Sequence, residues 1–98
     1  MSSDSCNRFE QDCEVLIDEG LHMRPAMQFV ECANGYQSEV YIEANGNTVN
    51  GKSIMQLTML AASKGTPLKV IAEGVDAEKA VLTLVNIIEG RTPNEFIK

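Results

Sequence analysis

The segment Gly20-Leu21-His22-Met23-Arg24-Pro25-Ala26 marks the first change of structure along this chain of 98 residues. Before it, the run Cys13-Glu14-Val15-Leu16-Ile17-Asp18 is rich in β-branched and apolar residues, which is typical of a strand. Pro25 has a fixed φ and no N–H, so it fits the first turn of a helix. The sequence therefore predicts a strand, a short turn and a helix, with His22 close to the helix N-cap.

The helix pattern continues beyond Pro25, and two short strands follow it. Apolar residues recur at helix spacing and predict one buried face, made of Ala26, Phe29, Val30 and Ala33. Gly35 follows as the expected helix stop. Residues 39–44 alternate between apolar and other side chains, and Asn45-Gly46 predicts a tight hairpin turn into a further strand over 47–50.

The second half of the chain predicts a helix and a strand. Ser53 and Gln56 form a Ser-x-x-Gln capping box, so a helix should begin here and continue to near Lys64-Gly65. The apolar face of this helix is expected to consist of Ile54, Leu57 and Ala61. Alternating apolar residues over 68–72 then predict a fourth strand.

Asp76 is a favourable N-cap residue and opens the last predicted helix, which stops at Gly90. The apolar stripe of this helix consists of Ala77, Ala80, Val81, Leu84, Val85 and Ile88. The element order is therefore βαββαβα. Because the strands and helices each have one apolar side, they require a two-layer α+β fold in which helices cover one face of a sheet.

The length allows one small domain with a single core. We expect a flexible polar tail over 1–12, the domain over 13–90 and a C-terminal extension over 91–98. No apolar run reaches the length of a membrane span, and the polar N-terminus lacks a signal-peptide pattern, so the expected location is the cytoplasm.

The three cysteines and the acidic charge exclude several classes of function. Cys6, Cys13 and Cys32 are odd in number and lack ligand spacing, which supports neither a disulfide framework nor a zinc site. Cys13 and Cys32 are interpreted as small apolar residues, buried or half-buried. A net charge of −6 argues against nucleic acid or anionic membrane as the main partner and favours a solvated acidic surface.

His22 is the candidate reactive residue. Amides at the start of a helix, together with the helix dipole, favour an anion, and Arg24 adds a permanent cation. An imidazole with a pKa of about 6.5 is largely neutral at pH 7, which leaves one ring nitrogen free as a nucleophile. A phosphohistidine carrier is one interpretation, and a lone histidine that caps a helix is the simpler one. An enzyme that uses His22 as a general base would lack partner groups.

Three segments resemble one family in the expected order. Gly20 to Ala26 resembles the signature Gly-Leu-His-x-Arg-Pro-Ala around the phosphorylated histidine of HPr, the phosphocarrier family of the bacterial sugar phosphotransferase system. Gly51-Lys52-Ser53-Ile54-Met55 resembles the regulatory-serine motif of that family, and residues 72–80, nearer the C-terminus, also resemble the family. The resemblance covers about residues 13–90. It implies a four-stranded antiparallel sheet with three helices on one face.

The resemblance also implies a phosphoryl relay. Enzyme I, charged from phosphoenolpyruvate, would load His22, and an EIIA-type domain would unload it. Arg24 and the helix start at Met23, Pro25 and Ala26 would support the phosphoryl group, and no metal or other cofactor is needed in this chain. The chain would then be a carrier rather than an enzyme, and nothing in its sequence demands more than a monomer.

Ser53 has two interpretations. As a helix cap, its hydroxyl satisfies a free amide, and its loss would cost about 1 kcal/mol. In the HPr family, the matching serine is a regulatory site for a serine kinase and phosphorylase. A phosphate here would add about −1.5 to −2 charges beside the surface on which partners dock.

The methionines mark a candidate docking surface. Met23 and Met27 lie one helical turn apart, as do Met55 and Met59, and all four fall outside the predicted core stripes. With Ile54, they would form a small adaptable apolar patch, or they would cap the edge of the core.

The chain departs from the family at three positions. Many HPr proteins carry lysines where this chain has Glu31, Asn34 and Gln56. Electrostatic steering toward an acidic surface on a typical Enzyme I should therefore be weaker. The alternative function is a regulatory paralogue, of the nitrogen branch or controlled by a kinase, that acts as a phosphorylation-dependent interaction switch without sugar transport.

Overall fold

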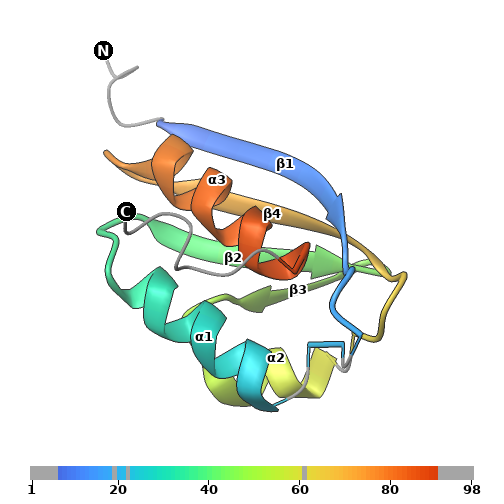
Figure 1. Cartoon of the computed structure of the whole chain (residues 1–98). Helices are drawn as coiled ribbons and strands as arrows, with labels where there is room; N and C mark the ends of the chain where they lie inside the picture. Colours follow the sequence, from blue (N-terminus) through green and yellow to red (C-terminus); the bar gives the residue numbers. More distant parts are fainter. Residues whose placement is uncertain (1–6, 19, 22, 61, 91–98) are drawn as a thin grey trace.

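In the computed structural model, the chain folds in the predicted order βαββαβα (Figure 1). The structure describes residues 7–18, 20–21, 23–60 and 62–90, with Met23 described by its backbone alone. The strands β1 (Arg8–Glu14), β4 (Pro67–Glu73), β2 (Glu39–Ala44) and β3 (Asn47–Asn50) form one antiparallel sheet in that spatial order. The helices are α1 (Met23–Asn34), α2 (Ile54–Leu60) and α3 (Ala77–Ile88).

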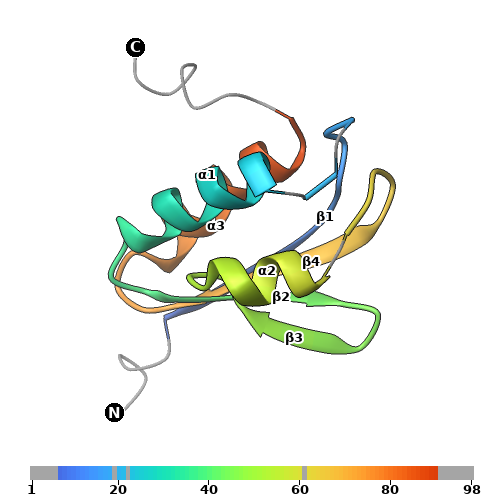
Figure 2. The same ribbon diagram turned by 90° about the horizontal axis from the view of Figure 1, so that it is seen from below.

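All three helices lie on the same face of the sheet, and the other face is open (Figures 1 and 2). The core lies between these two layers. Alternate residues of the central strands β2 and β4 point toward the helices, and Phe29 of α1 and Leu57 of α2 are fully buried against them. The predicted stripe of α3 is buried at every position. The predicted open-faced α+β sandwich with a four-stranded antiparallel sheet is therefore confirmed.

The hairpin between β2 and β3 has the turn that its sequence predicts. Ala44 pairs with Asn47, which leaves a two-residue turn. Asn45 has φ 54° and Gly46 has φ 82°, so both central residues adopt the left-handed backbone that a twisted hairpin requires.

The first strand begins earlier than predicted. The expected strand covered 13–18, whereas β1 runs from Arg8 to Glu14, so 8–12 belong to the sheet rather than to a tail. Within the described residues, β1 is an edge strand that pairs with β4 alone, and most of its side chains are exposed. It therefore lacks the apolar alternation by which a strand is recognised. Of the apolar run 13–18 that suggested a strand, only Cys13 and Glu14 belong to β1. Beyond them the chain leaves the sheet, and the Leu16 amide donates to the Ile88 carbonyl at 3.1 Å.

The second helix is shorter than predicted, and its capping box is half formed. It ends at Leu60 rather than near residue 64, while Ala61, which was expected on its apolar face, lies outside the described residues. The Ser53 hydroxyl accepts from the Gln56 amide at 3.3 Å, as a capping box requires. The Gln56 side chain, however, accepts from the Asn50 amide at 2.8 Å instead of reaching back to Ser53.

Asp76 stands at the N-cap position of α3, as predicted, and its carbonyl accepts from the Ala80 amide at 2.9 Å. Its side chain, however, makes no capping bond to its own helix. Instead, the carboxylate accepts from the amides of Gln37 and Ser38 at 2.9 and 3.0 Å and from the buried Ser38 hydroxyl at 2.5 Å. These bonds, the Ser38 hydroxyl first, hold the pKa of Asp76 below its ordinary value. Asp76 therefore ties the connection before α3 to the connection between α1 and β2.

Candidate functional site

The chain on the N-terminal side of the site is anchored in the core. His22 itself lies outside the described residues. Leu21, the residue before it, is fully buried, and its amide donates to the Ala62 carbonyl at 2.7 Å. This hydrogen bond joins the start of α1 to the segment that follows α2.

On the other side of His22, α1 begins at Met23, so Arg24, Pro25 and Ala26 all belong to its first turn, as predicted. Pro25 and Ala26 are buried, whereas Arg24 is exposed. The first amides of a helix have no intrahelical acceptor, and the first turn of α1 contains no acidic residue to offset its positive end. Among the described residues, none forms an ion pair with Arg24. This arrangement suits an anion at the start of α1.

Ser53 lies at the far end of α2 from this helix start. The Leu21–Ala62 bond places the residues after α2 beside the start of α1, whereas Ile54 at the beginning of α2 faces Val30 in the second half of α1. The seven residues of α2 span about 10 Å at the usual helical rise. Ser53 therefore lies on the same helical layer as the start of α1 but about one α2 length away from it.

Three of the four candidate docking methionines can be placed. Met27 is 47% exposed, Met55 71% and Met59 76%, and none of them belongs to the core. The side chain of Met23 lies outside the described part of the structure. Ile54 is half-buried and packs against the core from the start of α2. The exposed methionines are therefore solvent-facing groups rather than a cap on the core edge.

A shallow hollow of about 370 Å³ lies between α1 and α2. Its lining is Met27, Val30, Glu31 and Ile54. The sequence analysis assigned Val30 to the core face of α1 and so missed this role. Val30 follows Met27 by three residues, which places it at the border between the buried stripe and the exposed methionine, and this spacing is the signal that could have identified it.

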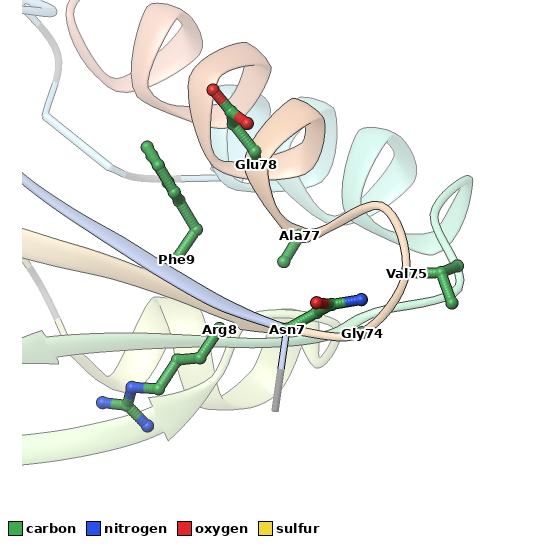
Figure 3. A pocket seen from close by; sticks show the side chains of 7 residues that line it. All are labelled: Asn7, Arg8, Phe9, Gly74, Val75, Ala77 and Glu78. Carbon is green, nitrogen blue, oxygen red and sulfur yellow. The ribbon is translucent and has the colours of Figure 1, made fainter. Parts of the chain in front are cut away.

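Another hollow, of about 250 Å³, lies between the beginnings of β1 and α3 (Figure 3). Its charged lining residues are Arg8 and Glu78. Figure 3 shows Phe9 and Glu78 on the helix side of β1 and Arg8 on the opposite side. The Arg8 guanidinium is already paired with Glu10 and Glu73 at 2.8 and 2.7 Å. This hollow therefore lacks a free convergent set of polar groups.

The two described cysteines are half-buried, as predicted. Burial, aided by the charges of Glu89 and Asp12, raises the pKa of the Cys13 thiol to about 12. Burial also raises the pKa of Cys32. Within the described ranges, no group of three His, Cys, Asp or Glu side chains is arranged to hold a metal ion, and no helix is long and apolar enough to cross a membrane.

Comparisons with known proteins agree on one family. Residues 9–90 match the family model described as the PTS HPr component phosphorylation site. Over 81 residues, 83% of this chain and 91% of the relative, the chain is 41% identical to the phosphocarrier protein HPr of Neisseria meningitidis. It is 44% identical to the HPr-like protein Crh of Halalkalibacterium halodurans over 82% of this chain and 95% of that protein.

A solved structure of HPr from Bacillus anthracis has the same fold. It superposes with a TM-score of 0.81 at 36% identity and covers 84% of this chain and 98% of that one. The family model, over residues 9–90, includes all three helices and the strands β2, β3 and β4 described above. The chain therefore belongs to the HPr family of the phosphotransferase system, whose members are carriers of a phosphoryl group and not enzymes.

Proposed function

We propose that His22 accepts a phosphoryl group from phosphorylated Enzyme I and passes it to an EIIA-type domain, in the cytoplasm and as a monomer. The observation that carries this proposal is the start of α1. Its first turn has no acidic residue and carries Arg24, two residues after His22, which is exposed and forms no ion pair with any residue that the structure describes.

The chemistry requires His22 to be a nucleophile and then a leaving group. A neutral ring nitrogen attacks phosphorus, a P–N bond forms, and the bond from phosphorus to the donor breaks with its electron pair leaving on the donor. The first amides of α1 and the Arg24 guanidinium then face the charged phosphoryl oxygens. Onward transfer to the acceptor reverses the step, so these groups must stabilise the oxygens without making the product too stable to donate.

Partners dock, in this proposal, on the surface formed by Met27, Ile54, Met55 and Met59. Adaptable methionine side chains suit a surface that meets more than one protein. Met55 and Met59 stand more than two thirds exposed on α2, so substitutions here have little to disturb in the core. Met55→Asp should slow transfer from Enzyme I while leaving the urea midpoint of unfolding unchanged.

The onward step is the test that separates a carrier from a switch. Wild-type protein labelled by Enzyme I is mixed with the EIIA-type domains of the same organism, and the label on each protein is followed over seconds. Rapid movement of label to one EIIA-type domain supports the carrier. A label that stays on this chain, together with a changed affinity for some other protein, would favour the switch.

Ser53 is proposed as the regulatory site. It is half-buried, and its hydroxyl accepts a single amide bond at the start of α2. A phosphate there would sit about one α2 length from the start of α1, so it would act on docking rather than on His22 directly. Label from the cognate serine kinase should appear on wild type and not on Ser53→Ala. Equal labelling of both would exclude this site.

The second candidate function is the regulatory paralogue. The relatives include both HPr and the HPr-like protein Crh at similar identity. Glu31, exposed beside the docking surface, also gives this chain a negative charge where many family members carry a lysine. Both observations fit a protein whose phosphorylation state is read by dedicated partners, without sugar transport.

A further inference from the structure

The hollow between α1 and α2 has one charged wall. Val30 and Ile54 are half-buried and pack against the core, and Met27 covers one side with its exposed thioether. Among the described residues of the lining, Glu31 alone is charged, and it lies one helical turn after Met27. An otherwise apolar hollow of about 370 Å³ therefore presents a carboxylate to whatever enters it.

Among the residues that the structure describes, no cation is paired with this carboxylate. The ion pairs in the described part of the chain involve Arg8, Lys64 and Lys69, and none involves Glu31. Lys52, in the connection before α2, is turned to the Tyr36 carbonyl at 2.9 Å. A partner that fills the hollow removes water from Glu31, and a carboxylate that loses water without gaining a donor opposes binding.

We propose that this hollow receives an arginine or lysine of the partner protein, with the stem of that side chain against Met27 and Ile54 and its charged head on Glu31. Such side chains bury an apolar stem while keeping the cation at the surface. Glu31 thus selects partners that carry a cation opposite the second half of α1 and rejects partners that carry an acid there. The inference rests on the proposed function, because it takes the docking partner to be the phosphoryl donor.

The test compares Glu31→Gln and Glu31→Lys with wild type, using the Enzyme I encoded by the same genome. Charge complementarity across an interface acts on encounter and register more than on chemistry. The expected result is a rise in KM for transfer of about fivefold for Glu31→Gln and about thirtyfold or more for Glu31→Lys, with kcat unchanged. The difference between the variants should shrink as salt rises from 0.05 to 0.5 M.

Glu39→Lys is the matched control. Glu39 is exposed on β2, next to Val40, whose side chain is buried toward the helices, so Glu39 faces the open side of the sheet. This variant makes the same change in net charge as Glu31→Lys. It should stay within about twofold of wild type, since its charge lies on the face that the helices do not cover.

The outcomes separate this inference from the proposed function. An unchanged or lower KM for Glu31→Lys would overturn the inference while the relay stands, and so would an equal effect of Glu39→Lys. Binding of the variants to unphosphorylated Enzyme I, measured by calorimetry, must follow the same order. A wild-type chain that neither binds Enzyme I nor receives phosphate would overturn the proposed function itself, and the inference with it.

Discussion

Gly51 is a position at which adding a single methyl group should destabilise the fold. It is buried, in the connection between β3 and α2, and its amide donates to the Val40 carbonyl at 2.7 Å. A Cβ on Gly51 would lie 2.6 Å from a Val40 methyl and 3.2 Å from Phe29 Cε1. Since real side chains do not tolerate the shorter distance, Gly51→Ala must displace Val40 or move the backbone away from it.

Two effects of opposite sign decide the size of the change. Overpacking a core by one group costs about 1–3 kcal/mol. Replacing glycine by alanine restricts the unfolded chain, which returns about 0.4–1 kcal/mol where the backbone is compatible, and Gly51 is not among the residues with positive φ. The net expectation is a loss of about 1–2 kcal/mol in the free energy of unfolding, or about 5–15 °C in Tm for a domain of this size.

Urea unfolding followed by far-UV circular dichroism measures this loss, since the chain has no tryptophan for fluorescence. The control is the same substitution in a Val40→Ala background. Removal of the two methyls should more than halve the cost, although the Val40 carbonyl stays 3.2 Å from the new Cβ. An unchanged or raised stability of Gly51→Ala, or an equal cost in both backgrounds, would refute the steric argument.

Two further predictions concern stability. The contacts to Ser38 and Gln37 keep the pKa of Asp76 below its ordinary value of about 3.9, so its contribution is complete above that pKa and is lost as pH falls through the lower folded-state pKa. Asp76→Asn should lower the urea midpoint of unfolding at pH 7, and below about pH 4 this midpoint should fall less steeply with pH than it does in wild type. If the midpoints of the two proteins fell in parallel with pH, the stabilising role given to the Asp76 carboxylate would be contradicted. Leu57→Ala, at a fully buried position, should lower the free energy of unfolding in urea by about 2–5 kcal/mol. Met59→Ala, at an exposed position, should lower it by less than about 0.5 kcal/mol. Similar costs for the two would mean that α2 faces the sheet differently.

Sequence periodicity predicted the elements whose faces are one-sided. The α3 stripe is buried throughout, and the Asn45-Gly46 turn adopts the backbone that those residue types favour. Local chemistry decides both, because helix spacing and turn preference depend on neighbours a few residues apart. The bounds of the edge strand β1 were predicted wrongly for the opposite reason. Its hydrogen bonds come from β4, some 60 residues away, and its exposed side chains carry no pattern.

The errors at the Asp76 and Gln56 side chains share another cause. Both side chains have the chemistry of a helix cap, and both bind backbone amides, but the amides belong to other connections. The residue type predicts that such a side chain binds free backbone amides. It does not predict which amides lie beside it, because that depends on the fold. In the candidate site, too, features set by local sequence were predicted, and features set by contacts between distant segments were not. Arg24 and the helix start follow from local sequence, whereas the hollow that Glu31 lines exists only once α1 and α2 lie together.

The most direct test of the phosphohistidine carrier is the chemistry of the phosphate on this chain. Labelled phosphoenolpyruvate and cognate Enzyme I are incubated with wild type and with His22→Ala, and the bound label is assayed for stability to acid and to alkali. The account predicts label on wild type that is lost in acid and retained in alkali, and none on His22→Ala. Label of equal amount on the two proteins, or none on folded wild type, would contradict it.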